Sequence, residues 1–67
     1  MKTLKTAVPG DVFRHEASGM EVEVMWTLPQ ELFIRSLTNV KGFTFGLEAR
    51  LEYHAKGWHF VRPGYVI

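Results

Sequence analysis

The strongest pattern in this sequence is the stretch MEVEVMW, residues 20–26, in which apolar and acidic side chains alternate. Alternation with period two is typical of a β-strand that has one buried face and one solvated face. The pattern places Met20, Val22, Val24 and Trp26 on the core face, and Glu21, Glu23 and Met25 on the outer face. We therefore expect a strand with one face in the core and the other face in solvent.

Two further segments of β-prone residues flank this strand. Residues 11–16 precede it across a turn at Gly19, where we expect a positive φ, and residues 32–37 follow it beyond Pro29, which cannot donate a hydrogen bond to a sheet. Short connections of this kind join antiparallel neighbours. The three segments predict an antiparallel meander.

The pattern changes in the last third of the chain. Leu47, Leu51 and Ala55 recur every four residues, and Gly57 follows as a candidate helix terminator. This spacing predicts a helix over about residues 46–56, before a closing strand at residues 58–61. The fold class expected is mainly β with one short helix (α+β), a small antiparallel barrel or a curled meander in a single domain over residues 1–67.

Composition narrows the class of protein. The 67 residues are 46% hydrophobic, contain no cysteine and carry a formal net charge of +1. A chain of this length forms one hydrophobic core. Without cysteine, neither a disulfide nor a thiolate zinc site can stabilise that core. The balanced charge argues against a strongly basic nucleic-acid module. Because no apolar run suits a signal peptide or a membrane span, we expect a cytoplasmic protein.

Residues 9–24 read Pro-Gly-Asp-Val-Phe-Arg-His, then Ser-Gly and the alternating strand, and residues 51–61 end in Lys-Gly-Trp-His-Phe-Val. Both segments resemble parts of the small SH3-like β-barrel modules that are common among uncharacterised bacterial and phage proteins. Such modules share a fold and not one activity, so the resemblance implies architecture only.

The side chains that carry chemistry are few and scattered. His15, His54 and His59 lie on separate segments without the paired spacing of a zinc motif, and no glycine-rich phosphate loop or nucleophile elbow is present. We therefore expect neither an enzyme nor a bound cofactor or metal.

Elimination leaves a small non-enzymatic binding module for a protein partner, in keeping with a phage or prophage regulator or inhibitor of a host protein. The candidate contact residues are Met25, Trp26 and Leu28 at one end of the sheet, and Tyr65, Val66 and Ile67 in the apolar tail. The tail is expected either to pair with residues 3–8 as an edge strand or to form a contact between two copies of the chain, because an open apolar strand needs a cover.

The alternative partner is single-stranded nucleic acid. The run KGFTF, residues 41–45, resembles the aromatic motif of RNA-recognition and cold-shock domains, whose rings stack on bases. The order of the surrounding segments differs from both families, and burial of Phe43 and Phe45 beneath the helix is the simpler expectation. In this alternative the contacts are Arg14, Arg35, Lys41, Phe43 and Phe45.

Overall fold

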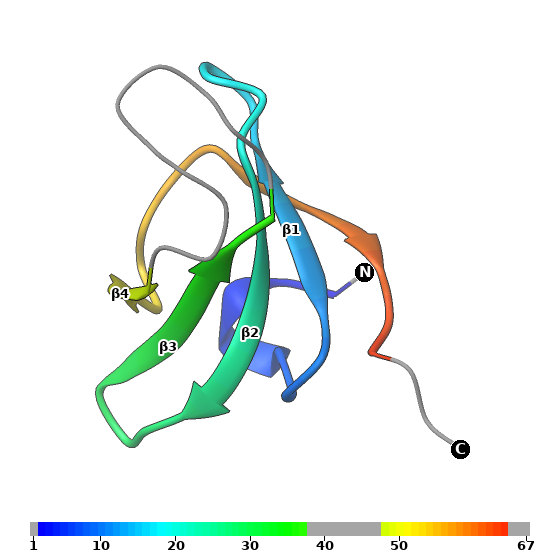
Figure 1. Ribbon diagram of the computed structural model, residues 1–67. Helices are drawn as coiled ribbons and strands as arrows, with labels where there is room; N and C mark the ends of the chain where they lie inside the picture. The colour runs from blue at the N-terminus through cyan, green and yellow to red at the C-terminus, as the bar shows by residue number, and fades with distance from the viewer. Residues whose placement is uncertain (1, 38–47, 65–67) are drawn as a thin grey trace.

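The computed structural model describes residues 2–37 and 48–64, and these residues form a mainly β fold (Figure 1). The elements in chain order are the 3-10 turn η1 (Leu4–Thr6) and the strands β1 (Val12–His15), β2 (Glu21–Thr27), β3 (Glu31–Ser36), β4 (Glu48–Glu52) and β5 (Trp58–Arg62). The strands lie in the order β4-β3-β2-β1-β5, and all neighbours are antiparallel. The predicted meander of the first three strands is confirmed.

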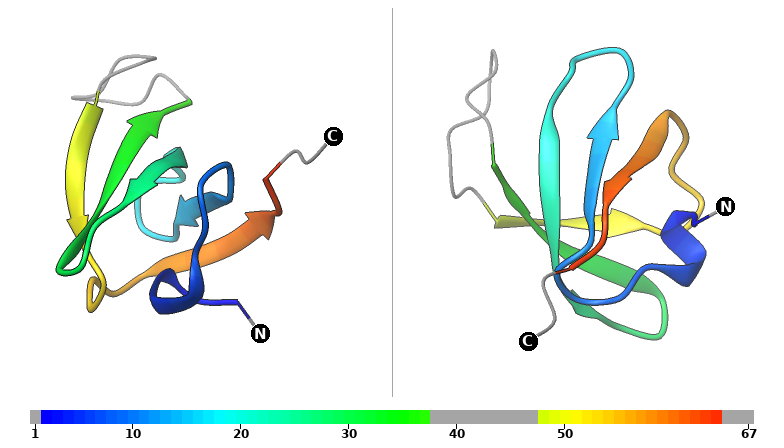
Figure 2. Two further views of the ribbon diagram at one scale, coloured as in Figure 1. Left: turned by 90° about the horizontal axis from the view of Figure 1, so that it is seen from below. Right: turned by 90° about the vertical axis from the view of Figure 1, so that its right-hand side faces the viewer.

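The sheet is strongly curled, with β4 and β5 at its two ends (Figure 2). Within the described residues these two strands do not pair with each other, so the sheet is open and not a closed barrel. Curling lets one face of a single sheet wrap round the core. The positive φ predicted for Gly19 is confirmed at 73°, in the turn between β1 and β2.

The core lies on the concave face of the sheet, which we call the inner face. Its fully buried side chains are Phe13 on β1, Val22 and Val24 on β2, and Leu32 on β3. Half-buried residues of the last two strands pack against them, and the ring of Phe60 meets that of Phe13 edge to face at 5.7 Å. Alternating apolar side chains from neighbouring strands thus supply most of the core.

The predicted helix is wrong where the structure describes it, because residues 48–52 form β4. Spacing of four residues satisfies a period of two as well as one of 3.6. The residues between the repeats decide the matter: Ala49 and Tyr53 also pack on the core, while Glu48, Arg50 and Glu52 are exposed. Gly57 has the positive φ of a helix terminator, 84°, but it serves a turn into β5.

The N-terminal segment also differs from expectation. Leu4–Thr6 form a 3-10 turn and not an edge strand, because the Thr6 hydroxyl accepts the Thr3 amide at 3.0 Å and donates to the Thr3 carbonyl at 3.2 Å. These local bonds compete with a sheet ladder. The turn buries Leu4 and Ala7 in the core. The tail expected to pair here, residues 65–67, lies outside the described residues.

Three segments meet at the carboxylate of Asp11, which is fully buried. One oxygen accepts the Val8 amide at 2.9 Å and pairs with Lys2 Nζ at 2.8 Å, and the other accepts the Gly64 amide at 3.0 Å. Burial, the largest single influence, raises the pKa of Asp11, but Lys2 and the two amides outweigh it and leave the pKa below its ordinary value. This carboxylate ties the N-terminus and the chain after β5 to the start of β1.

The chain after β5 passes very close to the turn that precedes β1. A Cβ atom at Gly64 would lie 2.8 Å from the Pro9 carbonyl oxygen and 2.9 Å from two backbone atoms of Gly10. Such distances are shorter than van der Waals contact, and backbone atoms cannot rotate away. Glycine at position 64 is therefore what allows its amide to reach Asp11.

We predict that Asp11→Ala lowers the free energy of unfolding by about 2–4 kcal/mol, because two amides lose their acceptor and Lys2 loses its partner. Asp11→Asn keeps the shape of the side chain and should cost less. Urea unfolding at neutral pH, followed by circular dichroism, measures both effects. Equal stability of the wild type and Asp11→Ala would contradict this role.

The same carboxylate predicts a pH dependence. Because the pKa of Asp11 is lower in the folded protein than its ordinary 3.8, its stabilisation is fully present above that pH and is lost as the pH falls through the folded value. Asp11→Asn lacks this titration, so the stability difference between the two proteins should shrink as the pH falls through this acid range. A constant difference from neutral to strongly acid pH would refute the assignment.

We predict that Gly64→Ala costs about 1–3 kcal/mol of stability, because the added methyl group must displace the Pro9 and Gly10 backbone. The neighbouring Pro63 is exposed, and Pro63→Ala is the matched control, with an expected change below about 1 kcal/mol. Thermal unfolding of both variants provides the comparison. A Gly64→Ala protein as stable as the control would show that this contact is not required.

Candidate binding surface

A β-bulge in β2 turns Trp26 away from the core. Val24 pairs with Ile34 and Trp26 pairs with Phe33, so Met25 is an extra residue between two consecutive pairs. An extra residue shifts the alternation by one position. Trp26 therefore lies on the convex, outer face with an exposed fraction of 63%, and the prediction that it faces the core is wrong.

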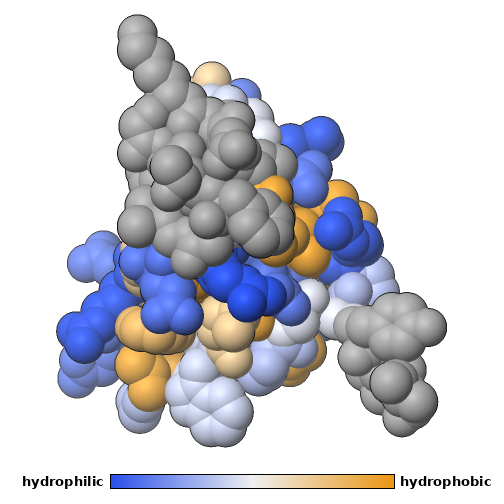
Figure 3. Space-filling model, in the orientation of Figure 1, coloured by the Kyte–Doolittle hydropathy of each residue, from blue (hydrophilic) through white to orange (hydrophobic). Residues whose placement is uncertain are grey.

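The bulge creates an apolar patch at the end of the β2–β3 hairpin. Its members are Met25, Trp26, Leu28, Pro29 and Phe33, which we call the Trp26 patch. Phe33 is the direct cross-strand neighbour of Trp26, and Met25, Leu28 and Phe33 are half-buried outside the core cluster. Figure 3 shows apolar surface at this end of the molecule, beside hydrophilic surface in the middle of the same face.

The tip of this hairpin is held in place from two directions. The Leu28 amide donates to the Glu31 carbonyl at 2.9 Å, and the Tyr53 hydroxyl donates to the Leu28 carbonyl at 2.5 Å. Leu28 and Pro29 also line two open depressions of about 510 and 330 Å³, the first shared with Tyr53 and the second with Glu31. Hydrogen bonds to β3 and to Tyr53 therefore hold the main chain of the patch at Leu28 in place.

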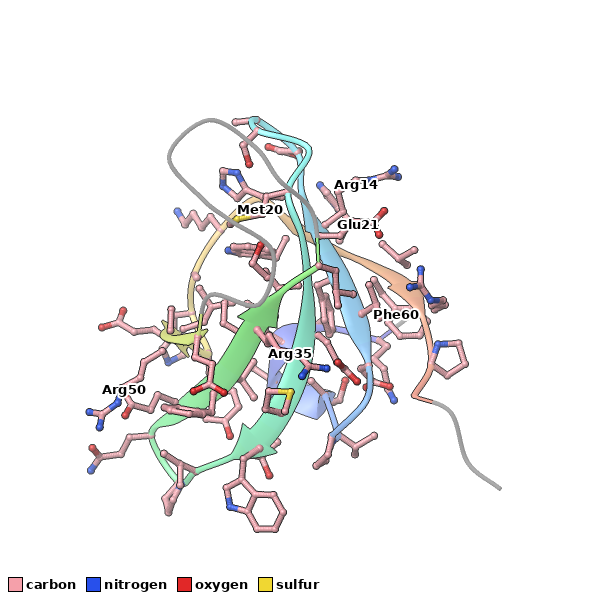
Figure 4. The ribbon with its side chains drawn as sticks, viewed as in Figure 1. Arg14, Met20, Glu21, Arg35, Arg50 and Phe60 are labelled. Atoms are coloured by element: carbon pink, nitrogen blue, oxygen red, sulfur yellow. The ribbon has the colours of Figure 1, made fainter. Side chains whose placement is uncertain are left out.

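Charged residues surround the patch on the outer face and are paired with one another. Arg35 extends over β2 to Glu23 at 2.7 Å, and Arg50 on β4 lies 3.4 Å from Glu31 (Figure 4). Farther along the face, Arg62 lies 3.8 Å from Glu21. The described strands carry four arginines against five glutamates on this face: Arg14, Arg35, Arg50 and Arg62 against Glu21, Glu23, Glu31, Glu48 and Glu52.

The structure brings together some of the residues that the sequence selected. Met25, Trp26 and Leu28 lie together in the Trp26 patch. The other protein-binding candidates, Tyr65, Val66 and Ile67, lie outside the described residues, as do Lys41, Phe43 and Phe45 of the nucleic-acid alternative. Arg14 and Arg35 share the outer face, but β2 separates them, and each stands opposite a glutamate of that strand.

Sequence reasoning missed two neighbours of Trp26. Phe33 alternates with the buried Leu32 and Ile34, so period two already placed it on the outer face. Arg50 pairs with Phe33 on the other side, and the helix assignment concealed this position. Trp26, Phe33 and Arg50 thus form one row across three strands.

A second cluster lies at the opposite end of the sheet, where β1 leaves for the hairpin turn. Glu16 Oε2 lies 2.6 Å from His59 Nε2, and the His15 ring lies 4.9 Å from that of Trp58. The hydrogen bond from His59 and its positive charge lower the pKa of Glu16, with a smaller contribution from the charge of His15. Ser18 Oγ lies 3.2 Å from His15 Nδ1 and accepts the Met20 amide at the same distance.

This cluster does not have the connectivity of a nucleophilic triad. Ser18 contacts His15, whereas the carboxylate of Glu16 contacts the other histidine, so no single imidazole links hydroxyl to carboxylate. The Ser18 hydroxyl also accepts a backbone amide within its own turn. These contacts join the hairpin turn to β5.

Among residues 2–37 and 48–64, no three or more histidine, aspartate or glutamate side chains are grouped closely enough to hold a metal ion. The same residues contain no helix of the length and hydrophobicity needed to cross a membrane. No protein-family model matches the chain, and neither the curated proteins nor the solved structures include a match. Within the described residues, the Trp26 patch is the candidate functional surface.

Proposed function

We propose that this protein is a small binding module that recognises a partner protein through the Trp26 patch. The observation that carries the proposal is the 63% exposure of Trp26 beside Phe33, at a position where the bulge has turned it out of the core. Tryptophan at the centre of an apolar patch with a polar rim is typical of protein interfaces.

The electrostatics of the outer face favour a protein over nucleic acid. A phosphate backbone binds where cationic side chains create a net positive field. Here three of the four arginines are paired with glutamates, and the five glutamates of the face outnumber them. An interface that mixes paired charges with an apolar centre suits a folded protein or a peptide.

We also propose that the chain is an SH3-like module of the small bacterial and phage type, with no catalytic activity of its own. The antiparallel meander curled round one core supports this at the level of architecture. Ser18 is bonded within its own turn and contacts His15, whereas Glu16 contacts His59 on β5, and this lack of a linked triad supports the proposal of no catalytic activity. In this proposal the protein acts by occupying a surface on a host or assembly partner.

We predict that Trp26→Ala abolishes capture of the partner while the domain stays folded. Loss of a central tryptophan costs about 2 kcal/mol or more in binding, which is about 30-fold in Kd. Its effect on stability should stay within about 1 kcal/mol, because the ring is outside the core and contributes mainly a cross-strand contact. Quantitative affinity capture from lysate, with and without nuclease, measures the loss.

The matched control is Val8→Ala. Val8 is the other large apolar side chain in the described residues that is at least half exposed, at 50%, and it precedes β1 instead of belonging to the patch. We expect Val8→Ala to capture the same proteins as the wild type. If Trp26→Ala captured them equally well, the patch would not be the binding surface, and capture that nuclease treatment abolished would favour nucleic acid instead.

A further inference from the structure

Strand β4 offers an open edge. Among the described residues it pairs with β3 only. The Leu37 amide, just after β3, donates to the Glu21 carbonyl on β2. The odd-numbered residues of β3 therefore direct their main-chain amides and carbonyls toward β2. By alternation, the main-chain groups of Leu32 and Ile34 point toward β4, where they are paired with Leu51 and Ala49. The main-chain amides and carbonyls of Glu48, Arg50 and Glu52 therefore point away from the sheet.

The side chains of this edge alternate in charge. Glu48, Arg50 and Glu52 are all exposed on the outer face. Arg50 lies 3.4 Å from Glu31 of its own chain and keeps most of its side chain in solvent, whereas Glu48 and Glu52 have no cationic partner within the part of the chain that the structure describes. On the inner face, Ala49 and Leu51 are only half-buried, whereas Leu32 on the neighbouring strand is completely buried. The Glu52 carbonyl accepts the Ala55 amide at 3.1 Å, and among the described residues no bond is seen from the outward groups of Glu48 and Arg50. The edge thus presents outward main-chain groups, alternating charges and partly exposed apolar side chains of the core.

This pattern is complementary to itself when two copies run antiparallel. With Leu51 on the two-fold axis, each Arg50 lies opposite the Glu52 of the other copy. With Ala49 on the axis, each Arg50 lies opposite Glu48. Only the register centred on Arg50 places like charges opposite each other, and all three registers match the outward main-chain groups.

We propose that β4 is a homodimerisation edge, at which two copies of this chain join their sheets through reciprocal pairing of Arg50 with a glutamate of the other copy. Pairing would supply partners for the outward main-chain groups of Glu48 and Arg50 and would cover the half-buried side chains of Ala49 and Leu51. Because the edge is only five residues long, the interface is smaller than that of a stable dimer, and the association is weak and concentration-dependent. Charge complementarity selects a second copy as the occupant.

The dimer has a consequence that rests on the proposed function. A two-fold axis perpendicular to the joined sheets keeps both outer faces on the same side. Five strand spacings would separate the two copies of β2, which is roughly 24 Å at about 4.8 Å per spacing. Two Trp26 patches would then face one partner surface, and bivalent binding would strengthen a weak single contact.

The test is a charge swap read out by sedimentation velocity and by chemical-shift changes on dilution from millimolar to micromolar protein. The wild type should approach twice the monomer mass at the high end, with shifts confined to β4 and its neighbours. Arg50→Glu should weaken dimerisation at least tenfold, since it creates like-charge pairs. Lys5→Glu, an exposed charge reversal on η1, should dimerise as the wild type does.

The decisive arm mixes two variants that fail alone. A mixture of the Arg50→Glu protein with the Glu52→Arg protein should form a heterodimer if Leu51 lies on the axis. A mixture of the Arg50→Glu protein with the Glu48→Arg protein should form one if Ala49 lies on the axis. Circular dichroism confirms that each variant is folded. No partner protein is involved, so this result is independent of the proposed function.

Three results would overturn the proposal. One is a wild type that stays monomeric at millimolar concentration, and another is Arg50→Glu dimerising as strongly as the wild type. The third is loss of the dimer when the chain is ended after Gly64, which would assign the contact to the tail of residues 65–67. Dimerisation of that shortened chain at wild-type strength would support the β4 edge.

Discussion

The buried Asp11 carboxylate lies where the N-terminal segment, the start of β1 and the chain after β5 come together, and each of them is bonded to it. A chain of 67 residues without disulfides has a small free energy of unfolding. A single buried site that fixes three segments therefore contributes a large share of it. Gly64 makes the site possible by allowing two stretches of backbone to approach. The position of β5, and with it one end of the curled sheet, depends on this contact.

The sequence predicted the strands β1, β2 and β3 and the closing strand β5, and it misread the N-terminal segment and residues 48–56. Alternation in residues 20–26 was long enough to identify β2, and Gly19 and Pro29 marked the connections on either side of it. The helix assignment failed over residues 48–56, which the structure describes, because the spacing of Leu47, Leu51 and Ala55 fits two periods at once. Contacts with β3, which lies more than ten residues earlier, decided in favour of a strand, and sequence spacing does not reveal such tertiary contacts.

The same limit applied to the candidate surface. Met25, Trp26 and Leu28 were chosen from the sequence, yet simple alternation assigned Trp26 to the core. One inserted residue at the bulge reversed that assignment, and a bulge is set by pairing with Phe33 and Ile34 and not by local sequence. The bulge therefore links the geometry of β2 to the proposed function.

The measurement that most directly tests this link is the pattern of nuclear Overhauser contacts made by the Trp26 indole ring. The bulge predicts contacts with the Phe33 ring and none with Leu32 or Leu51. Contacts between the indole ring and Leu32 or Leu51 would place Trp26 in the core. That result would contradict the bulge and remove the surface on which the function was proposed.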